Sequence, residues 1–326
     1  MNTIINFLFA AIKAGTPLLL GTTGEIITEK SGSLNLGVEG LMYMGAFAGF
    51  YAGYKTNSVI IAVIASMLMA MFGALIFAFL TVTLQANQNV TGLTLTIFGS
   101  GLSIFFGQQM INNEGGKPSM SVDFMAKLAE EPLPLLGDIP VVGKILFSHN
   151  PLVYLAVVIA ILAWIYIRFT RAGLNMRAVG ENAAAADASG INVNRVKYMN
   201  ILLGGGVCGI GGAYIAIINS YGGWDNGCIN GQGWISVALV IFASWSPAKA
   251  ILGSLVFGAF SAFQIRANEF ASAFPALSFL AEIPSAIYVM LPFLLTAIIL
   301  IFTSIRGKRE GAQPANCGIN YYREER

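Results

Sequence analysis

The residues that could do chemistry in this sequence are few, and they do not form an enzyme's constellation. His149 is the one histidine, and the three cysteines lack CxxC spacing and predict three free thiols. No HExxH, GxSxG or GxxxxGK[ST] motif occurs. We therefore expect no catalytic residue, cofactor or metal site in this chain. If the protein performs active transport, an ion gradient drives it or another chain hydrolyses ATP.

Polar residues at the ends of apolar runs are candidates for contact with a polar solute. Glu39 is the one costly charge inside a predicted membrane segment. It is either a structural carboxylate that bonds the amides of its own turn, "SGSLNLGVEG", or part of a substrate pocket. Amides and hydroxyls nearby could bind a neutral solute, or cap and join helices. The candidate pathway residues are Asn35, Glu39, Asn87, Asn89, Thr91 and Phe98.

The stretch "VGENAAAADASGINVNRV" is a second candidate, because it is short and polar between two apolar runs. Asn182 suits a helix N-cap, the alanines favour a helix, and Gly190 suits its end. About two turns are too short to be stable alone, so this helix must dock on something. It is either a solvated loop helix or a coupling helix held by a motor protein. The candidate coupling residues are Glu181, Asn182, Ala185, Asp187, Gly190 and Ile191.

Membrane helices are the elements that must position these residues. The chain is 56% hydrophobic and 10% charged, whereas soluble domains carry about 25% charged residues. The runs predict an all-α, polytopic transmembrane bundle of about nine spans, with eight and ten as alternatives. One run, Ile235–Trp245, is short enough to be a half-helix. The runs are Ile4–Thr23, Leu34–Tyr54, Val59–Leu84, Val90–Met110, Leu152–Ile167, Met199–Ile218, Ile235–Trp245, Ile251–Ile265 and Ile283–Phe302.

The placement of lysine and arginine orients the predicted bundle. The basic loop 168–198 and the polar tail 306–326 are expected in the cytoplasm, together with the loop Gly24–Ser33. The acidic loop 111–150 is expected outside as short helices and turns, either a passive connector or a docking surface. Residues 1–305 are then one transmembrane domain. The net charge of +2 indicates no nucleic-acid partner.

Three stretches resemble a known family. "GLNMRAVGENAAAADASGINVNRVKYMNILLGGGVCGIGGAYI" resembles the cytoplasmic loop and following helix of permease subunits of ABC importers for ribose-like sugars and nucleosides. "GEIITEKSGSLNLGVEGLMYMGAFAGF" is similar to the nucleoside branch, which uses BMP-type receptors. "SVALVIFASWSPAKAILGSLVFGAF" is similar to a late helix–loop–helix unit. The sequence departs from the family at Trp245-Ser246-Pro247, which replaces a Gly-rich turn, and in the additional tail Gln313–Arg326.

The resemblance implies a type II-like importer permease, multi-pass in a bacterial cytoplasmic membrane and surrounded by lipid. With a second permease, in a heterodimer, it would form the translocation pathway for nucleosides. A separate ATPase subunit would bind ATP and Mg and grip the coupling helix, which maps onto Glu181–Ile191. An external substrate-binding lipoprotein would deliver the nucleoside. A ribose-like sugar permease and a stand-alone carrier or channel are the alternatives.

Overall fold

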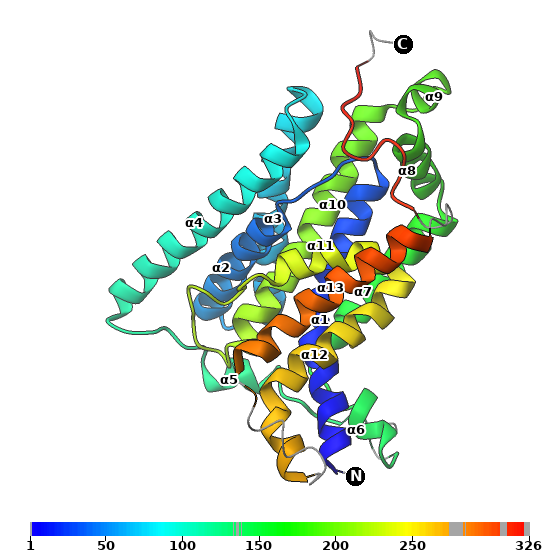
Figure 1. Cartoon of the computed structure of the whole chain (residues 1–326). Helices are drawn as coiled ribbons and strands as arrows, with labels where there is room; N and C mark the ends of the chain where they lie inside the picture. Colours follow the sequence, from blue (N-terminus) through cyan, green and yellow to red (C-terminus); the bar gives the residue numbers. More distant parts are fainter. Residues whose placement is uncertain are drawn as a thin grey trace.

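The computed structural model describes residues 2–132, 134, 137, 139–273, 283, 285–306 and 312–322. These residues form a bundle of helices (Figure 1), with one isolated β-bridge between Ser119 and Gly223. The helices are α1 (Asn2–Lys30), α2 (Val38–Thr56), α3 (Val59–Ala78), α4 (Gln88–Glu114), α5 (Val122–Ala126), α6 (Val142–Leu146), α7 (Pro151–Phe169), α8 (Arg171–Glu181), α9 (Ala183–Ala188), α10 (Val193–Tyr214), α11 (Gln232–Phe242), α12 (Pro247–Ala273) and α13 (Ser285–Arg306). Two π-helical turns, η1 (Phe79–Thr83) and η2 (Ile215–Asn219), extend α3 and α10.

Six helical segments of the described chain are long and apolar enough to cross a membrane. They confirm an all-α, multi-pass membrane protein, but they do not support the expected count of about nine spans. The run Ile235–Trp245 corresponds to α11, whose 11 residues are too few to cross alone. The six segments are Thr3–Lys30, Val59–Thr83, Gln88–Glu114, Pro151–Phe169, Val193–Asn219 and Pro247–Ala267.

Helix α1 is longer than its apolar run, and the expected loop Gly24–Ser33 is wrong for most of its length. The helix continues without a break to Lys30. Two of its polar side chains, Thr22 and Glu29, bond to distant parts of the bundle. The Thr22 hydroxyl donates to the Ser236 carbonyl at 3.0 Å, and the Glu29 carboxylate accepts the indole N–H of Trp245. The chain leaves α1 only at Ser31.

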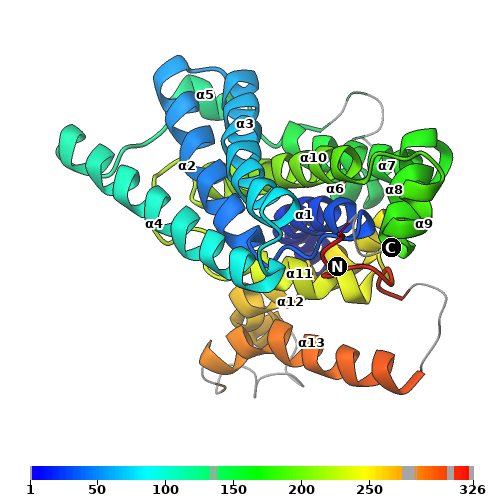
Figure 2. The same ribbon diagram turned by 90° about the horizontal axis from the view of Figure 1, so that it is seen from above.

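Helix α10 lies beside α1 (Figure 2) and packs against α1, α2 and α3, and most of its apolar residues are buried. Its glycines let neighbouring backbones approach without side chains between them. A Cβ at Gly209 would collide with Ser66, and one at Gly212 with the carbonyl of Met42. A Cβ at Gly204 would likewise overlap the backbone of α1. The central contacts of the fold are therefore backbone against backbone.

The two loops that the charge pattern assigns to opposite sides lie at opposite ends of the bundle (Figure 1). The end of α1, the α8–α9 segment and residues 312–322 share one end, hereafter the coupling end. The N-terminus, α5 and α6 lie at the other, the loop end. The loop 111–150 contains two short helices, as predicted. Its Phe124 is buried, and the Met120 amide donates to the Gly222 carbonyl at 2.7 Å.

Replacing Gly212 with alanine should destabilise the bundle, because the new methyl group has no space beside Met42. Overpacking of this kind costs about 1–3 kcal/mol. Thermal unfolding of the purified protein in detergent would measure the loss. The matched control is Gly101→Ala on α4, where a Cβ meets nothing within 4 Å. Unfolding of both variants at the wild-type temperature would show that the contact between α10 and α2 can accommodate a methyl group.

Candidate substrate pathway and coupling surface

Glu39 lies at the start of α2 and holds the first turn of α11 inside the bundle. One carboxylate oxygen accepts the Gly231 amide N–H at 2.8 Å, and the other accepts that of Gly233 at 2.7 Å. Gly231 is the N-cap of α11, with φ +84°, and Glu39 is 6% exposed. A carboxylate here satisfies amides that have no partner within the helix and complements the positive end of the helix dipole. Glu39 is bonded to backbone amides as in the structural interpretation, but those of α11 rather than of its own turn.

The irregular segment before α11 covers the part of the bundle that this short helix does not span. After η2 the chain bonds to the loop end, where the Trp224 amide donates to the Pro118 carbonyl at 2.9 Å. It then returns to Glu39 at Gly231. Beyond α11, Trp245 reaches Glu29 near the end of α1. The irregular segment and α11 therefore run from the loop end toward the coupling end as one unit.

Asn35 lies in the buried connection between α1 and α2. Its amide N–H donates to Glu25 at 3.1 Å, and its side-chain oxygen accepts the Gly37 amide at 2.9 Å. Glu25 and Glu29 are both buried on α1. These two acids are not among the expected site residues, because the charge pattern placed residues 24–33 in a loop. Their i, i+4 spacing, which puts both on one helical face, was the available signal.

The four candidates on or beside α4 lie in different environments. Asn87 is exposed and is the N-cap of α4, accepting the Val90 amide at 3.1 Å. The Thr91 hydroxyl donates to the Asn87 carbonyl at 2.8 Å, and Asn89 is exposed. Phe98 is 46% exposed on the outer face of α4.

The six pathway candidates therefore do not converge on one point. The connection that contains Asn35 packs against α4, where the Thr96 hydroxyl donates to the Leu36 carbonyl at 3.1 Å. Asn35 and Glu39 are buried in the bundle, while Asn89 and Phe98 face away from it. The pathway role of these residues stays a prediction.

The candidate coupling residues form a compact knob at the coupling end. Asn182 breaks the helix between α8 and α9 and caps α9 by accepting the Ala185 amide at 2.9 Å. Gly190, at φ +85°, ends it. Ala183 and Ala186 are buried against Val179 and Val193 of the same chain. The exposed residues of the knob are Glu181, Asn182, Ala184, Ala185, Ala188, Ser189 and Gly190, while Ile191 is half-buried.

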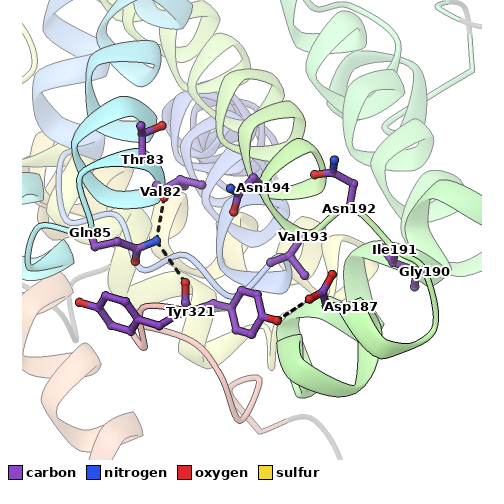
Figure 3. Close-up of a pocket in the computed structure, with 11 residues that line it drawn as sticks. Val82, Thr83, Gln85, Asp187, Gly190, Ile191, Asn192, Val193, Asn194 and Tyr321 are labelled. Atoms are coloured by element: carbon purple, nitrogen blue, oxygen red, sulfur yellow. Dashed lines mark hydrogen bonds between the residues drawn. The ribbon is translucent and has the colours of Figure 1, made fainter. Parts of the chain in front are cut away.

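An open cavity of about 590 Å³ separates the knob from η1 (Figure 3). Tyr321 from the C-terminal segment lies on its wall, and its hydroxyl donates to Asp187 at 2.7 Å. Gln85 lies on the far side and donates to the Tyr321 carbonyl at 3.1 Å. Residues 312–322 thus contact both sides of the cavity. Within this segment, burial raises the pKa of the Cys317 thiol. The remaining lining residues are Val82, Thr83, Gly190, Ile191, Asn192, Val193, Asn194 and Tyr322.

Residues 7–303 match the family of permease components of branched-chain amino acid transport systems. The chain belongs to this family. Membership confirms a transport subunit of the cytoplasmic membrane rather than an enzyme.

Curated relatives are similar over nearly their whole length. The nucleoside ABC transporter permease protein NupC of Lactococcus lactis is 34% identical, over 100% of this chain and 99% of the relative. The guanosine ABC transporter permease protein NupQ of Bacillus subtilis is 31% identical, over 97% and 96%. A permease of Haloferax volcanii, provisionally named for glucose, is 33% identical over 94% of each. No solved structure matches the chain significantly.

Replacing Glu39 with alanine should loosen α11, because two buried amide groups lose their acceptors. Each unpaired buried group costs about 1–3 kcal/mol. We expect a lower unfolding temperature, with Glu39→Gln intermediate because it keeps one acceptor oxygen. Glu114→Ala is the control, since its exposed pair with Lys55 is worth about 1 kcal/mol or less. Equal unfolding temperatures for Glu39→Ala and Glu114→Ala would contradict the capping role.

Proposed function

We propose that this chain is the permease subunit of an ATP-driven ABC importer for nucleosides. The full-length similarity to NupC supports the substrate class, and the similarity to a guanosine permease points the same way. The observation that carries the ATP-driven mechanism is the α9 knob. It is a short, capped helix fixed to the bundle by two buried alanines, with its outer face uncovered at one end of the molecule.

The motor would be a separate ATPase subunit that binds ATP and Mg and docks on the outer face of α9. Small residues such as Ala184 and Ala185 let a partner's groove close tightly around the helix. Glu181 and Asp187 flank them as charges that fix orientation. Because α9 follows α8 directly after the break at Asn182 and leads into α10, a force applied to the knob reaches the most buried of the membrane-crossing helices that the structure describes.

The translocation pathway would lie between this chain and a second, different permease. Helix α4 lies at the edge of the bundle (Figure 2), and it exposes large apolar side chains together with Asn89. Such a face suits either lipid or a second permease. We propose nine crossings in this chain: the six apolar helices, α2, α13, and the irregular segment together with α11. The type II-like arrangement of the complete importer belongs to this proposal.

The outer partner would be a substrate-binding lipoprotein that delivers nucleoside at the loop end. Residues 111–150 pack on that end through Phe124 and through an ion pair of Glu130 with Lys13. Packing of this kind gives a receptor an ordered surface. In that loop, burial lowers the pKa of His149, whose ring stacks on Phe9 with centroids 4.3 Å apart. Burial therefore favours the neutral form of the His149 imidazole.

Sugar import is the second candidate, because the Haloferax volcanii relative carries glucose in its name. The experiment that separates the two is co-purification from native membranes, followed by ATPase assays of the complex with a receptor and uridine, adenosine, ribose or glucose. Nucleoside import predicts co-purification of an ATPase and a second permease, and stimulation by a nucleoside-loaded receptor. Stimulation by sugar alone would favour the second candidate. Solute movement by this chain alone in liposomes would overturn both.

Replacing Ala185 with arginine should prevent docking of the ATPase, because a long cation then projects from the exposed face of α9. Arginine is a good helix former, so the knob itself should persist. We expect both the amount of co-purified ATPase and the rate of uptake to fall below about a tenth of the wild-type values. A decrease of this size is typical of a hot-spot residue in an interface. Ala129→Arg, exposed at the loop end, is the matched control for co-purification and should retain the ATPase. Normal co-purification of the Ala185→Arg variant would refute the docking site.

A further inference from the structure

We propose that the C-terminal segment 312–322 is a strap that transmits movement of the coupling helix to the connection between η1 and α4. Within it, Asn320 and Tyr321 are the positioning residues, each holding a different side of the cavity. The inference rests on the proposed function, because it assumes that an ATPase moves α9. It adds a role for residues 312–322, which lie beyond the residues 7–303 that match the family but within the full-length similarity to NupC.

The first attachment of the strap is to the coupling segment. The Tyr321 hydroxyl donates to the Asp187 carboxylate at 2.7 Å, a charge-assisted hydrogen bond (Figure 3). The Tyr321 side chain also packs against the apolar cluster that seats α9. Earlier in the segment, the Asn316 amide donates to the Gly180 carbonyl at 2.9 Å, and the Ala315 amide donates to the Glu181 carboxylate at 3.4 Å. The segment therefore follows the α8–α9 break over several residues.

The second attachment is to the chain between η1 and α4. The Asn320 side-chain amide donates to the carbonyls of Gln85 and Ala86, at 2.6 and 3.2 Å. Its oxygen accepts the Gln88 side-chain amide at 3.0 Å. Gln85, at φ +57°, adopts a left-handed conformation where the π-helical turn ends. Asn320 thus binds carbonyls beyond the end of one helix and a side chain in the first turn of the next.

The second attachment continues into the bundle. The Gln88 side-chain oxygen accepts the Leu34 amide at 2.7 Å. Leu34 precedes Asn35, whose amide is bonded to buried Glu25. A continuous series of contacts therefore leads from Asp187, through the strap, to the connection before α2. Helix α2 carries Glu39, the cap of α11.

The cavity separates the two elements that the strap joins, so the strap is the part that connects them at this place. The cavity is lined by the α9–α10 connection on one side and by η1 and Gln85 on the other, with Tyr321 at its wall. The α9–α10 connection and η1 face each other across open space at the cavity, so neither pushes on the other there; η1 contacts α10 further along, where the hydroxyls of Thr83 and Tyr198 share a hydrogen bond of 2.5 Å. Adjacent residues of one extended segment bind both sides of the cavity, so displacement of α9 pulls on the η1–α4 connection. Through the hydrogen bonds of the strap, displacement of α9 would then shift the equilibrium between the outward-open and inward-open forms of the importer.

The test uses the complete importer in liposomes and measures ATP hydrolysed per nucleoside imported. Tyr321→Phe removes only the hydroxyl that bonds Asp187. Tyr322→Phe removes a neighbouring phenol hydroxyl, also at the cavity, and is the matched control. We expect Tyr321→Phe to raise the ratio on the order of five-fold, the scale of typical coupling between sites. Assembly with the ATPase should stay normal, and Tyr322→Phe should retain the wild-type ratio.

Two further variants locate the effect in the strap. If Tyr321 acts through Asp187, then Asp187→Ala, which removes the acceptor, should raise the ratio similarly in complexes that retain the ATPase, and the double variant should be no worse than either single one. Asn320→Ala removes the three side-chain hydrogen bonds of the second attachment, leaves the bond from Gln85 to the Tyr321 carbonyl, and does not touch α9, so it should also raise the ratio. A ratio per assembled complex does not depend on how much protein folds, so poor expression of one variant does not obscure the result.

The proposal is overturned if Tyr321→Phe matches Tyr322→Phe, or if uptake and hydrolysis fall in proportion, as for a structural residue. Both results would leave the proposed function standing, because the wild-type importer would still couple ATP to uptake. By contrast, a wild-type chain that transports solute with no ATPase would overturn the proposed function and the strap together.

Discussion

The cap that Glu39 places on α11 is the interaction on which the arrangement of the bundle depends. Within a membrane, each backbone amide must find a partner in the protein, because no water is available to replace one. A helix that starts inside the bundle would leave its first amides unpaired, and the Glu39 carboxylate binds two of those groups. The second acid, Glu29, binds Trp245 just after the other end of α11. The short helix is thus bracketed by two buried glutamates on different elements.

The contacts of Glu39 and Glu29 determine where α1 must end and where α2 must begin. Helix α1 has to remain helical up to Lys30 so that Glu29 faces Trp245, and α2 has to begin beside α11 so that Glu39 reaches it. The connection between them is correspondingly short and buried, with Asn35 bonded to Glu25. Charges that are costly in an apolar bundle are therefore retained where they pair with backbone or indole N–H groups.

The sequence predicted those features that depend on local pattern. Each of the nine apolar runs coincides with a helix, and Asn182 and Gly190 bound α9 as expected. The features it missed depend on contacts distant in sequence. The polar end of α1 reads as a loop until Trp245, 216 residues away, is known to bind Glu29. The partners of Glu39 and the attachments of the C-terminal segment are hidden for the same reason.

The glycine contacts around α10 have a consequence for how the molecule can move. Where two backbones touch, no rotamer exchange can absorb a change in spacing, so the helices have one distance of approach. Such contacts join α10 to α1, α2 and α3, and similar ones join α1 to α12 at Gly15 and Gly258, and α2 to α4 at Gly40. The helices joined by these contacts therefore behave as one rigid body. A displacement of the coupling segment that reaches the η1–α4 connection would then move these helices together and would not bend the bundle.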